Sequence, residues 1–207
     1  IARAGAVQVN VNPLYTPREL EHQLKDSGAE TIVILENFAI TLQDVLKNTP
    51  VKNVITTQIG DMLGFPKSLI VNMVVKHVKK MVPSWSIHNT VKFNDTLTQG
   101  SRLKLNPVQI GHDDIAFLQY TGGTTGVSKG AMLTNRNIVA NMMQAHAWLK
   151  PMVREGQEII ITALPLYHIF SLTANCLTFL KIGANNVLIP NPRDIPGFVK
   201  ELGRHRF

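Results

Sequence analysis

The sequence predicts an α/β fold with mostly parallel sheets flanked by helices. Over residues 1–60, apolar stretches typical of strands alternate with stretches of helical periodicity in the order β-α-β-α-β. The alternation returns over 111–207, after an irregular interval at 61–110. Strands that alternate with helices usually pair in parallel. We therefore expect two α/β segments joined by an insertion.

The first segment, residues 1–60, begins with a predicted strand in AVQVNVNP, followed by a helix in YTPRELEHQLKDSGA. Thr16 as N-cap and Glu19 three residues later form a capping box, and Pro17 suits the first helical position. Gly28 can end this helix. We then expect a strand in TIVIL, a helix in FAITLQDVLKN and a strand in NVITT.

The insertion, residues 61–110, contains a basic amphipathic stretch at 66–82 that is predicted to be helical. On a helical wheel one side is apolar (Ile70, Met73, Val74, Val78, Met81 and Val82), and Lys76, Lys79 and Lys80 cluster on the other. Such a helix can lie on an anionic membrane surface. The alternative is a helix packed on its own domain, with its lysines in water. The chain from there to the next strand reads as linker with a short helix at most.

The second segment, residues 111–207, is predicted to continue as strand, helix, strand, helix, strand and helix. The corresponding stretches are IAFLQY, NIVANMMQAHAWL, EIIITALPLY, SLTANCLTFLKIG, NVLIP and IPGFVKELG. We expect Thr134 or Asn135 to cap the first of these helices. Ser171 is predicted to cap the second, and Gly183 to end it.

The net charge of +7 is compatible with a nucleic acid, a membrane surface or a phosphorylated ligand as partner. The basic residues form no continuous stripe, so no nucleic-acid partner is expected. The single cysteine, Cys176, excludes an internal disulfide framework and fits a reducing, cytoplasmic setting. It lies in an apolar helical pattern and is predicted to pack rather than to react. No signal peptide and no stretch of about 20 apolar residues is visible.

One loop, YTGGTTGVSKGAML at 120–133, carries the clearest functional pattern. Its glycines allow backbone N–H groups to converge on an anion. Threonine hydroxyls add donors and Lys129 adds a positive charge, so the loop suits a polyphosphate better than a simple turn. Two residues separate Gly126 from Lys129, which excludes the P-loop pattern, and the glycine spacing also excludes the dinucleotide fingerprint G-x-G-x-x-G.

The longer stretch YTGGTTGVSKGAMLTNRN resembles the Thr/Ser/Gly-rich signature of the AMP-forming acyl-CoA synthetases, in the acyl-adenylate-forming superfamily. That signature usually reads Y-T-S-G-T-T-G-x-P-K-G, so Gly122 replaces a serine here and Ser128 a proline. GAVQVNVNPLYTPRELEHQLKDSGA and LPLYHIF resemble the family's flanking blocks. Together with NPRDIPGFVKEL, these blocks are most similar to bacterial long-chain fatty-acid–CoA ligases.

The resemblance implies a partial N-terminal domain of the acyl-adenylate-forming fold and a two-step reaction. A fatty-acid carboxylate attacks the α-phosphorus of ATP and expels pyrophosphate, and coenzyme A then displaces AMP. The family uses ATP, Mg²⁺ and CoA. The residues implied in phosphate binding are Thr121, Gly122, Gly123, Thr124, Thr125, Gly126 and Lys129. Lys129, Thr124 and His168 are the implied catalytic residues. A cytoplasmic enzyme is expected, while peripheral contact with the inner face of the cell membrane and a homodimer are both left open.

His168 in PLYHIF is expected to end a strand at the same sheet edge as the loop, where open α/β sheets bind ligands. By resemblance it would line the acyl and adenylate pocket. The alternative is a histidine packed beside Tyr167 and Phe170. The stretch GHDD at 111–114 could suggest a metal site, but a turn or cap is the expected role and no metal site is assigned.

Several parts of the family's machinery are not found in this sequence. These are the downstream Y-G-x-T-E motif, the ribose-binding aspartate, the hinge and the C-terminal domain with its catalytic lysine. We therefore expect a piece of the N-terminal domain with little or no ligase activity alone. Two alternatives remain: an adenylating enzyme acting on an aryl or amino acid, and a non-catalytic nucleotide- or membrane-binding module.

Overall fold

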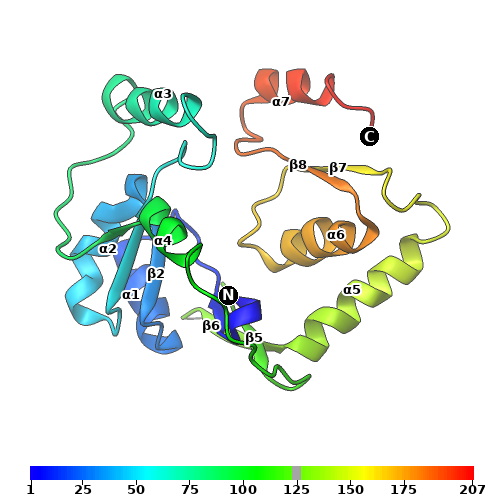
Figure 1. Cartoon of the computed structure of the whole chain (residues 1–207), viewed down its shortest axis with the longest axis horizontal. Helices are drawn as coiled ribbons and strands as arrows, with labels where there is room; N and C mark the ends of the chain where they lie inside the picture. The colour runs from blue at the N-terminus through cyan, green and yellow to red at the C-terminus, as the bar shows by residue number, and fades with distance from the viewer. Residues whose placement is uncertain (123–126) are drawn as a thin grey trace. The chain divides into compact units, whose positions relative to one another are not determined.

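A computed structural model describes residues 1–122 and 127–207 of the chain (Figure 1). Contacts between Cα atoms divide it into two compact units. The first comprises Ile1–Asn10, Gln109–Gln119 and Ala131–Phe207, and the second comprises Val11–Val108 and Tyr120–Gly130. In the described ranges, four pairs of neighbouring strands are parallel, which confirms the predicted α/β class with mostly parallel sheets.

The second unit is built on a three-stranded sheet with the strand order β2-β3-β4. Its elements are α1 (Pro17–Ser27), β2 (Thr31–Leu35), α2 (Ala39–Val45), β3 (Asn53–Thr57), α3 (Lys67–Met73), β4 (Val91–Lys92) and α4 (Phe93–Gly100). Single 3₁₀ turns flank α2 at Glu36–Phe38 and Leu46–Asn48. The predicted bounds of β2 and β3 are confirmed, whereas β4 was not predicted.

Helix α1 begins and ends as its sequence predicts. The Thr16 side chain accepts a hydrogen bond from the Glu19 backbone, and the Glu19 carboxylate accepts one from the Thr16 backbone at 2.8 Å. This backbone bond, helped by the Thr16 hydroxyl, holds the pKa of Glu19 below its ordinary value. Gly28 ends the helix with a left-handed φ of 65°, which only glycine adopts without strain.

The core of the second unit lies between α1, α2 and the sheet. Its buried apolar members are Leu20, Leu24, Ile32, Ala39, Leu42, Val45, Val54 and Ile87. Leu20 and Leu24 come from one face of α1, and they are 4% and 2% exposed. Because both side chains are enclosed, α1 is fixed against β2 and α2, and its remaining face can support other parts of the unit.

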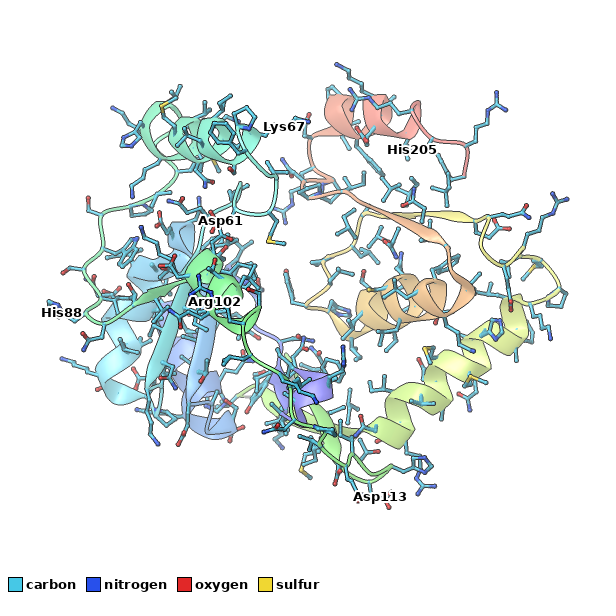
Figure 2. The ribbon with its side chains drawn as sticks, in the orientation of Figure 1. Asp61, Lys67, His88, Arg102, Asp113 and His205 are labelled. Carbon is cyan, nitrogen blue, oxygen red and sulfur yellow. The ribbon has the colours of Figure 1, made fainter. Side chains whose placement is uncertain are left out.

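The basic stretch predicted to be helical over 66–82 is helical over 67–78, and it is not one regular α-helix. After α3, residues Val74–Val78 form a π-helical turn, and the helix stops there. Asp61, in the connection from β3, anchors α3 by accepting a hydrogen bond from Asn72 Nδ2 at 3.0 Å (Figure 2). Gly60 N donates to Asn72 Oδ1 at 2.7 Å, and a Cβ at Gly60 would come within 2.7 Å of that oxygen.

The first unit contains two small sheets, three α-helices and a π-helix. Its elements are β1 (Gln8–Val9), β5 (Ile115–Thr121), β6 (Lys129–Thr134), α5 (Asn135–Leu149), β7 (Ile159–Thr162), a π-helix (Ser171–Leu177), α6 (Thr178–Ile182), β8 (Asn185–Leu188) and α7 (Ile195–Leu202), after a 3₁₀ turn at Ala2–Ala4. The strand orders are β1-β5-β6 and β7-β8. The last residues of β5 and the first residues of β6 belong to the second unit, which includes Tyr120–Gly130. None of the helices in the described ranges has the length and apolar character needed to cross a membrane.

Helix ends in the first unit confirm some predictions and correct one. Thr134, rather than Asn135, caps α5, and it does so with a capping box to Asn137. Gly183 ends α6 in a left-handed conformation with a φ of 76°, as predicted. The prediction of Ser171 as an N-cap is wrong. Its side chain is fully buried inside the helical segment, and its hydroxyl donates to the Leu164 carbonyl at 2.9 Å.

Candidate functional site

The candidate phosphate loop is shorter than the sequence suggested. The sequence predicts a loop over 120–133, but β5 continues to Thr121 and β6 begins at Lys129. The connection therefore spans 122–128. Glycine and alanine early in β6 have low strand propensity, and pairing within the sheet overrides it. Lys129 thus stands at the first position of a strand.

The predicted phosphate-binding residues fall into two groups. Gly123, Thr124, Thr125 and Gly126 lie outside the described residues. Thr121, Gly122 and Lys129 are described, and all three are exposed. Lys129 forms no ion pair with any residue in the described ranges, so its ammonium group is available to a ligand there. Among the described residues, no atom lies within 4 Å of where a Cβ at Gly122 would be, so none of them obstructs the serine usual at this place in the family signature.

A hydrogen bond joins the two ends of the loop. Ser128 Oγ donates to the Thr121 carbonyl oxygen at 3.0 Å. The carbonyl oxygen of Ser128 lies 2.8 Å from Nε2 of His22, on α1. Because a carbonyl oxygen can only accept, Nε2 carries the proton in this contact. Thr121 and Ser128 are therefore hydrogen-bonded to each other, and Ser128 is also hydrogen-bonded to α1, which is distant in sequence.

Tyr120 provides a second connection between the loop and α1. Its hydroxyl donates to Asp26 Oδ2 at 2.6 Å, and the side chain is buried. Burial first, and then the Asp26 carboxylate, raise the pKa of Tyr120, so the phenol stays protonated and remains a donor. A Cβ at Gly130 would come within 2.9 Å of the Tyr120 ring. Glycine at 130 therefore allows the ring to lie against the start of β6.

His168 is not placed at the end of a strand, which corrects the prediction. The strand expected over 158–167 stops at Thr162, because the following residues turn toward the next helix. His168 lies at the start of that helix, where its carbonyl accepts from Leu172 N at 3.0 Å and its Nδ1 accepts from Phe170 N at 3.3 Å. The side chain is exposed. Its Nδ1 is an acceptor, so a neutral ring carries its proton on Nε2.

The turn before His168 is tied to β5 by a residue to which the sequence pattern drew no attention. Gln119 is 6% exposed, and its Nε2 donates to the Tyr167 carbonyl at 3.3 Å. Its Oε1 accepts from Asn10 Nδ2 at 3.2 Å. A buried amide within an otherwise apolar strand is the signal that could have identified it, because a buried polar group needs partners.

The remaining candidates have structural roles. In the GHDD stretch, Asp114 Oδ2 accepts from Gly111 N at 2.7 Å, and Asp113 pairs with Arg136 at 3.2 Å, which confirms the predicted turn (Figure 2). In the described ranges, no group of three or more histidine, cysteine, aspartate or glutamate side chains could hold a metal ion. Cys176 is half-buried, and burial raises the pKa of its thiol, which fits packing rather than nucleophilic chemistry.

Comparison with known proteins defines the class to which this fold and loop belong. Residues 1–207 match the sequence model of the family described as AMP-binding enzyme, and the chain belongs to that family. It is 55% identical over 207 residues to a long-chain-fatty-acid–CoA ligase of Escherichia coli O6:H1, covering all of this chain and 37% of that protein. The same-named protein of Haemophilus influenzae is 54% identical over 209 residues, with the same coverage.

A solved structure with the same fold is that of the anthranilate–CoA ligase AuaEII in complex with anthranoyl-AMP. The TM-score is 0.74 at 21% sequence identity, over 99% of this chain and 34% of that one. This likeness shows the fold alone. Measured against the long-chain-fatty-acid–CoA ligases described above, the chain spans about 37% of their length.

Proposed function

We propose that the gene product carrying this chain activates a long-chain fatty acid. The acid is converted to an acyl-adenylate at the expense of ATP and then to acyl-CoA, with release of pyrophosphate and AMP. The observation that carries the proposal is the identity of 55% to the Escherichia coli ligase, sustained across all 207 residues. Lys129 beside the glycine-rich loop supports it independently, because this side chain is exposed and forms no ion pair with the residues that the structure describes.

In this proposal the loop binds the β- and γ-phosphates of ATP. A fatty-acid oxygen attacks the α-phosphorus, the bond to the bridging oxygen breaks, and pyrophosphate leaves with the electron pair. The acid is already ionised, so no general base is needed, and stabilisation of phosphate charge is the main task. Thr121 and Lys129 would supply a hydroxyl and a positive charge, together with Gly122, Gly123, Thr124, Thr125 and Gly126. Mg²⁺ binds ATP through phosphate oxygens, and its charge would add to that of Lys129.

His168 is proposed to line the pocket for the acyl group and the adenylate. Its exposure supports this role, and so does the bond that fixes its Nδ1 as an acceptor. A neutral His168 would then present Nε2–H to a ligand carboxylate or phosphate as a donor. The family resemblance of LPLYHIF is the reason to assign that ligand to the acyl-adenylate.

The substrate class is tested by an acid profile of the complete gene product that carries this chain. We expect palmitate to give palmitoyl-CoA and equal amounts of AMP and pyrophosphate, with a kcat/KM at least tenfold above those for anthranilate and 4-coumarate. An aryl acid as the best substrate would assign the protein to the alternative represented by AuaEII. AMP formation with none of these acids, in a protein that binds ATP, would favour the non-catalytic module.

A membrane contact is proposed as a second property, on the strength of the surface around α3. Its exposed apolar side chains are Met62, Leu63, Phe65, Leu69, Ile70, Met73, Val78 and Met81. Lys67, Lys76, Lys79 and Lys80 are exposed in the same stretch (Lys67 is labelled in Figure 2). Lys76 pairs with Glu36 at 3.5 Å, so Lys79 and Lys80 are the better candidates for lipid phosphate. A long-chain fatty acid dissolves in membranes, which gives such a contact a purpose.

Charge reversal at Lys79 and Lys80 should weaken binding to anionic vesicles. Each lysine near such a surface contributes about 1 kcal/mol, so the double change to glutamate should lower vesicle partitioning at least about 30-fold at low salt. Co-sedimentation with phosphatidylglycerol vesicles measures this. Lys47→Glu with Lys104→Glu makes the same charge change at exposed sites outside the basic stretch. Equal binding of both double variants would contradict a specific contact.

A further inference from the structure

Helix α1 contacts both ends of the phosphate loop through two side chains one turn apart. His22 reaches the Ser128 carbonyl, which directly precedes Lys129, at 2.8 Å. Asp26 accepts from the hydroxyl of Tyr120, which directly precedes Thr121, at 2.6 Å. Residues i and i+4 of a helix project from the same face, so one face of α1 holds the chain on entry to the loop and on exit from it.

We propose that His22 and Asp26 are positioning residues for ATP binding: they fix the spacing of Thr121 and Lys129 so that both reach the same polyphosphate. This inference rests on the proposed function of the loop. Neither side chain needs to touch the nucleotide. Each acts through the backbone or the ring of a residue that adjoins a phosphate-binding residue.

The anchoring helix is well suited to that task. Leu20 and Leu24, on the other face of α1, are fixed in the core, and the capping box fixes the N-terminal end. The Tyr120 ring occupies space beside Gly130 that a Cβ at that position would enter, at 2.9 Å from the ring. The positions of the two contacts are therefore set by a packed element rather than by the loop itself.

Ser128 adds a bond specific to a serine at this place. Its hydroxyl ties residue 128 to the Thr121 carbonyl at 3.0 Å. The proline usual in the family signature could not form this bond, although its carbonyl could still accept from His22. The chain therefore replaces the stiffness of proline with a hydrogen bond across the ends of the loop, and the bond to α1 is kept.

The test compares His22→Asn with His22→Gln in the complete gene product that carries this chain. Glutamine places its amide N–H three bonds from Cβ, as Nε2 of histidine does, whereas asparagine places it two bonds away. His22→Asn should raise the KM for ATP about 2- to 12-fold, the range of one ordinary hydrogen bond. His22→Gln should stay within twofold of the wild type. The KM for the fatty acid and the melting temperature should change little in either variant.

A second pair of variants tests Asp26 in the same way, with one variant that keeps the hydrogen bond and one that removes it. Asp26→Asn keeps an oxygen that can accept from Tyr120, and Asp26→Ala removes it, so only the alanine variant should raise the KM for ATP. Equal KM values for ATP within each pair would overturn the inference, and so would a parallel rise in the KM for the fatty acid.

The Lys129→Ala variant distinguishes a failure of this inference from a failure of the proposed function of the loop. If Lys129→Ala raises the KM for ATP and the His22 and Asp26 variants do not, the inference fails and the proposed function stands. If Lys129→Ala has no effect, the proposed function of the loop fails.

Discussion

Lys129→Ala should lower fatty-acid-dependent ATP–pyrophosphate exchange about 100- to 1,000-fold in the complete gene product that carries this chain. That is the usual cost of removing one donor that stabilises developing charge in an enclosed site. Lys129 is exposed and has no ionic partner in the described part of the chain, so the substitution breaks no ion pair there that could account for a loss. The rate constant of exchange at saturating fatty acid, measured against ATP concentration, provides the readout.

Lys104→Ala is the matched control, because this lysine is also exposed and lies in a stretch without regular structure. It should leave both exchange and ATP affinity unchanged. Exchange in the Lys129 variant within threefold of the wild type would show that the loop does not hold the phosphates through this side chain. A parallel loss in both variants would indicate a general effect of surface charge on the binding of an anionic nucleotide.

Leu24→Ala should destabilise the second unit by about 2–5 kcal/mol, the range for truncating a buried leucine. Leu24 is 2% exposed and packs among the core residues that fix α1. Urea unfolding followed by circular dichroism, or by fluorescence of Trp85, which packs against this core, measures the change. The same substitution at Leu69, which is 63% exposed on α3, should cost less than about 0.5 kcal/mol. Equal losses at the two sites would contradict the assigned core.

Local sequence signals were sufficient for the elements at the start of the chain. The bounds of β2 and β3, the capping box of α1 and its glycine stop are all as predicted. Each of these depends on residues within a few positions of one another, such as Thr16 with Glu19 or the apolar run of TIVIL. Short-range physical chemistry alone decides them.

Elements that depend on pairing or packing were missed or misplaced. Strand β4 is only two residues long and β6 begins with residues of weak strand propensity, and both exist because a neighbouring strand is there to pair with. The apolar run of EIIITALPLY concealed the end of β7 at Thr162, and with it the position of His168. Ser171 has the residue type of an N-cap, but the helical segment already includes the residue before it, so its hydroxyl is used inside the fold.

In the candidate site, too, features set by neighbouring residues could be predicted, and features set by long-range contacts could not. The loop motif marked Thr121, Gly122 and Lys129 because their types and spacing are local. It could not reveal that His22 and Asp26 hold the ends of the loop, since these contacts span 106 and 94 positions of sequence. Only the folded chain brings α1 beside the loop.

The central claim is that the loop serves adenylate formation, and isotope exchange without coenzyme A tests it most directly. The complete gene product that carries this chain, incubated with ATP, Mg²⁺, palmitate and labelled pyrophosphate, should return label to ATP at a rate that depends on palmitate. This result requires that the first step be reversible and independent of the thiol. Label that enters ATP only when coenzyme A is present, or equally well without palmitate, would contradict an acyl-adenylate as the product of this site.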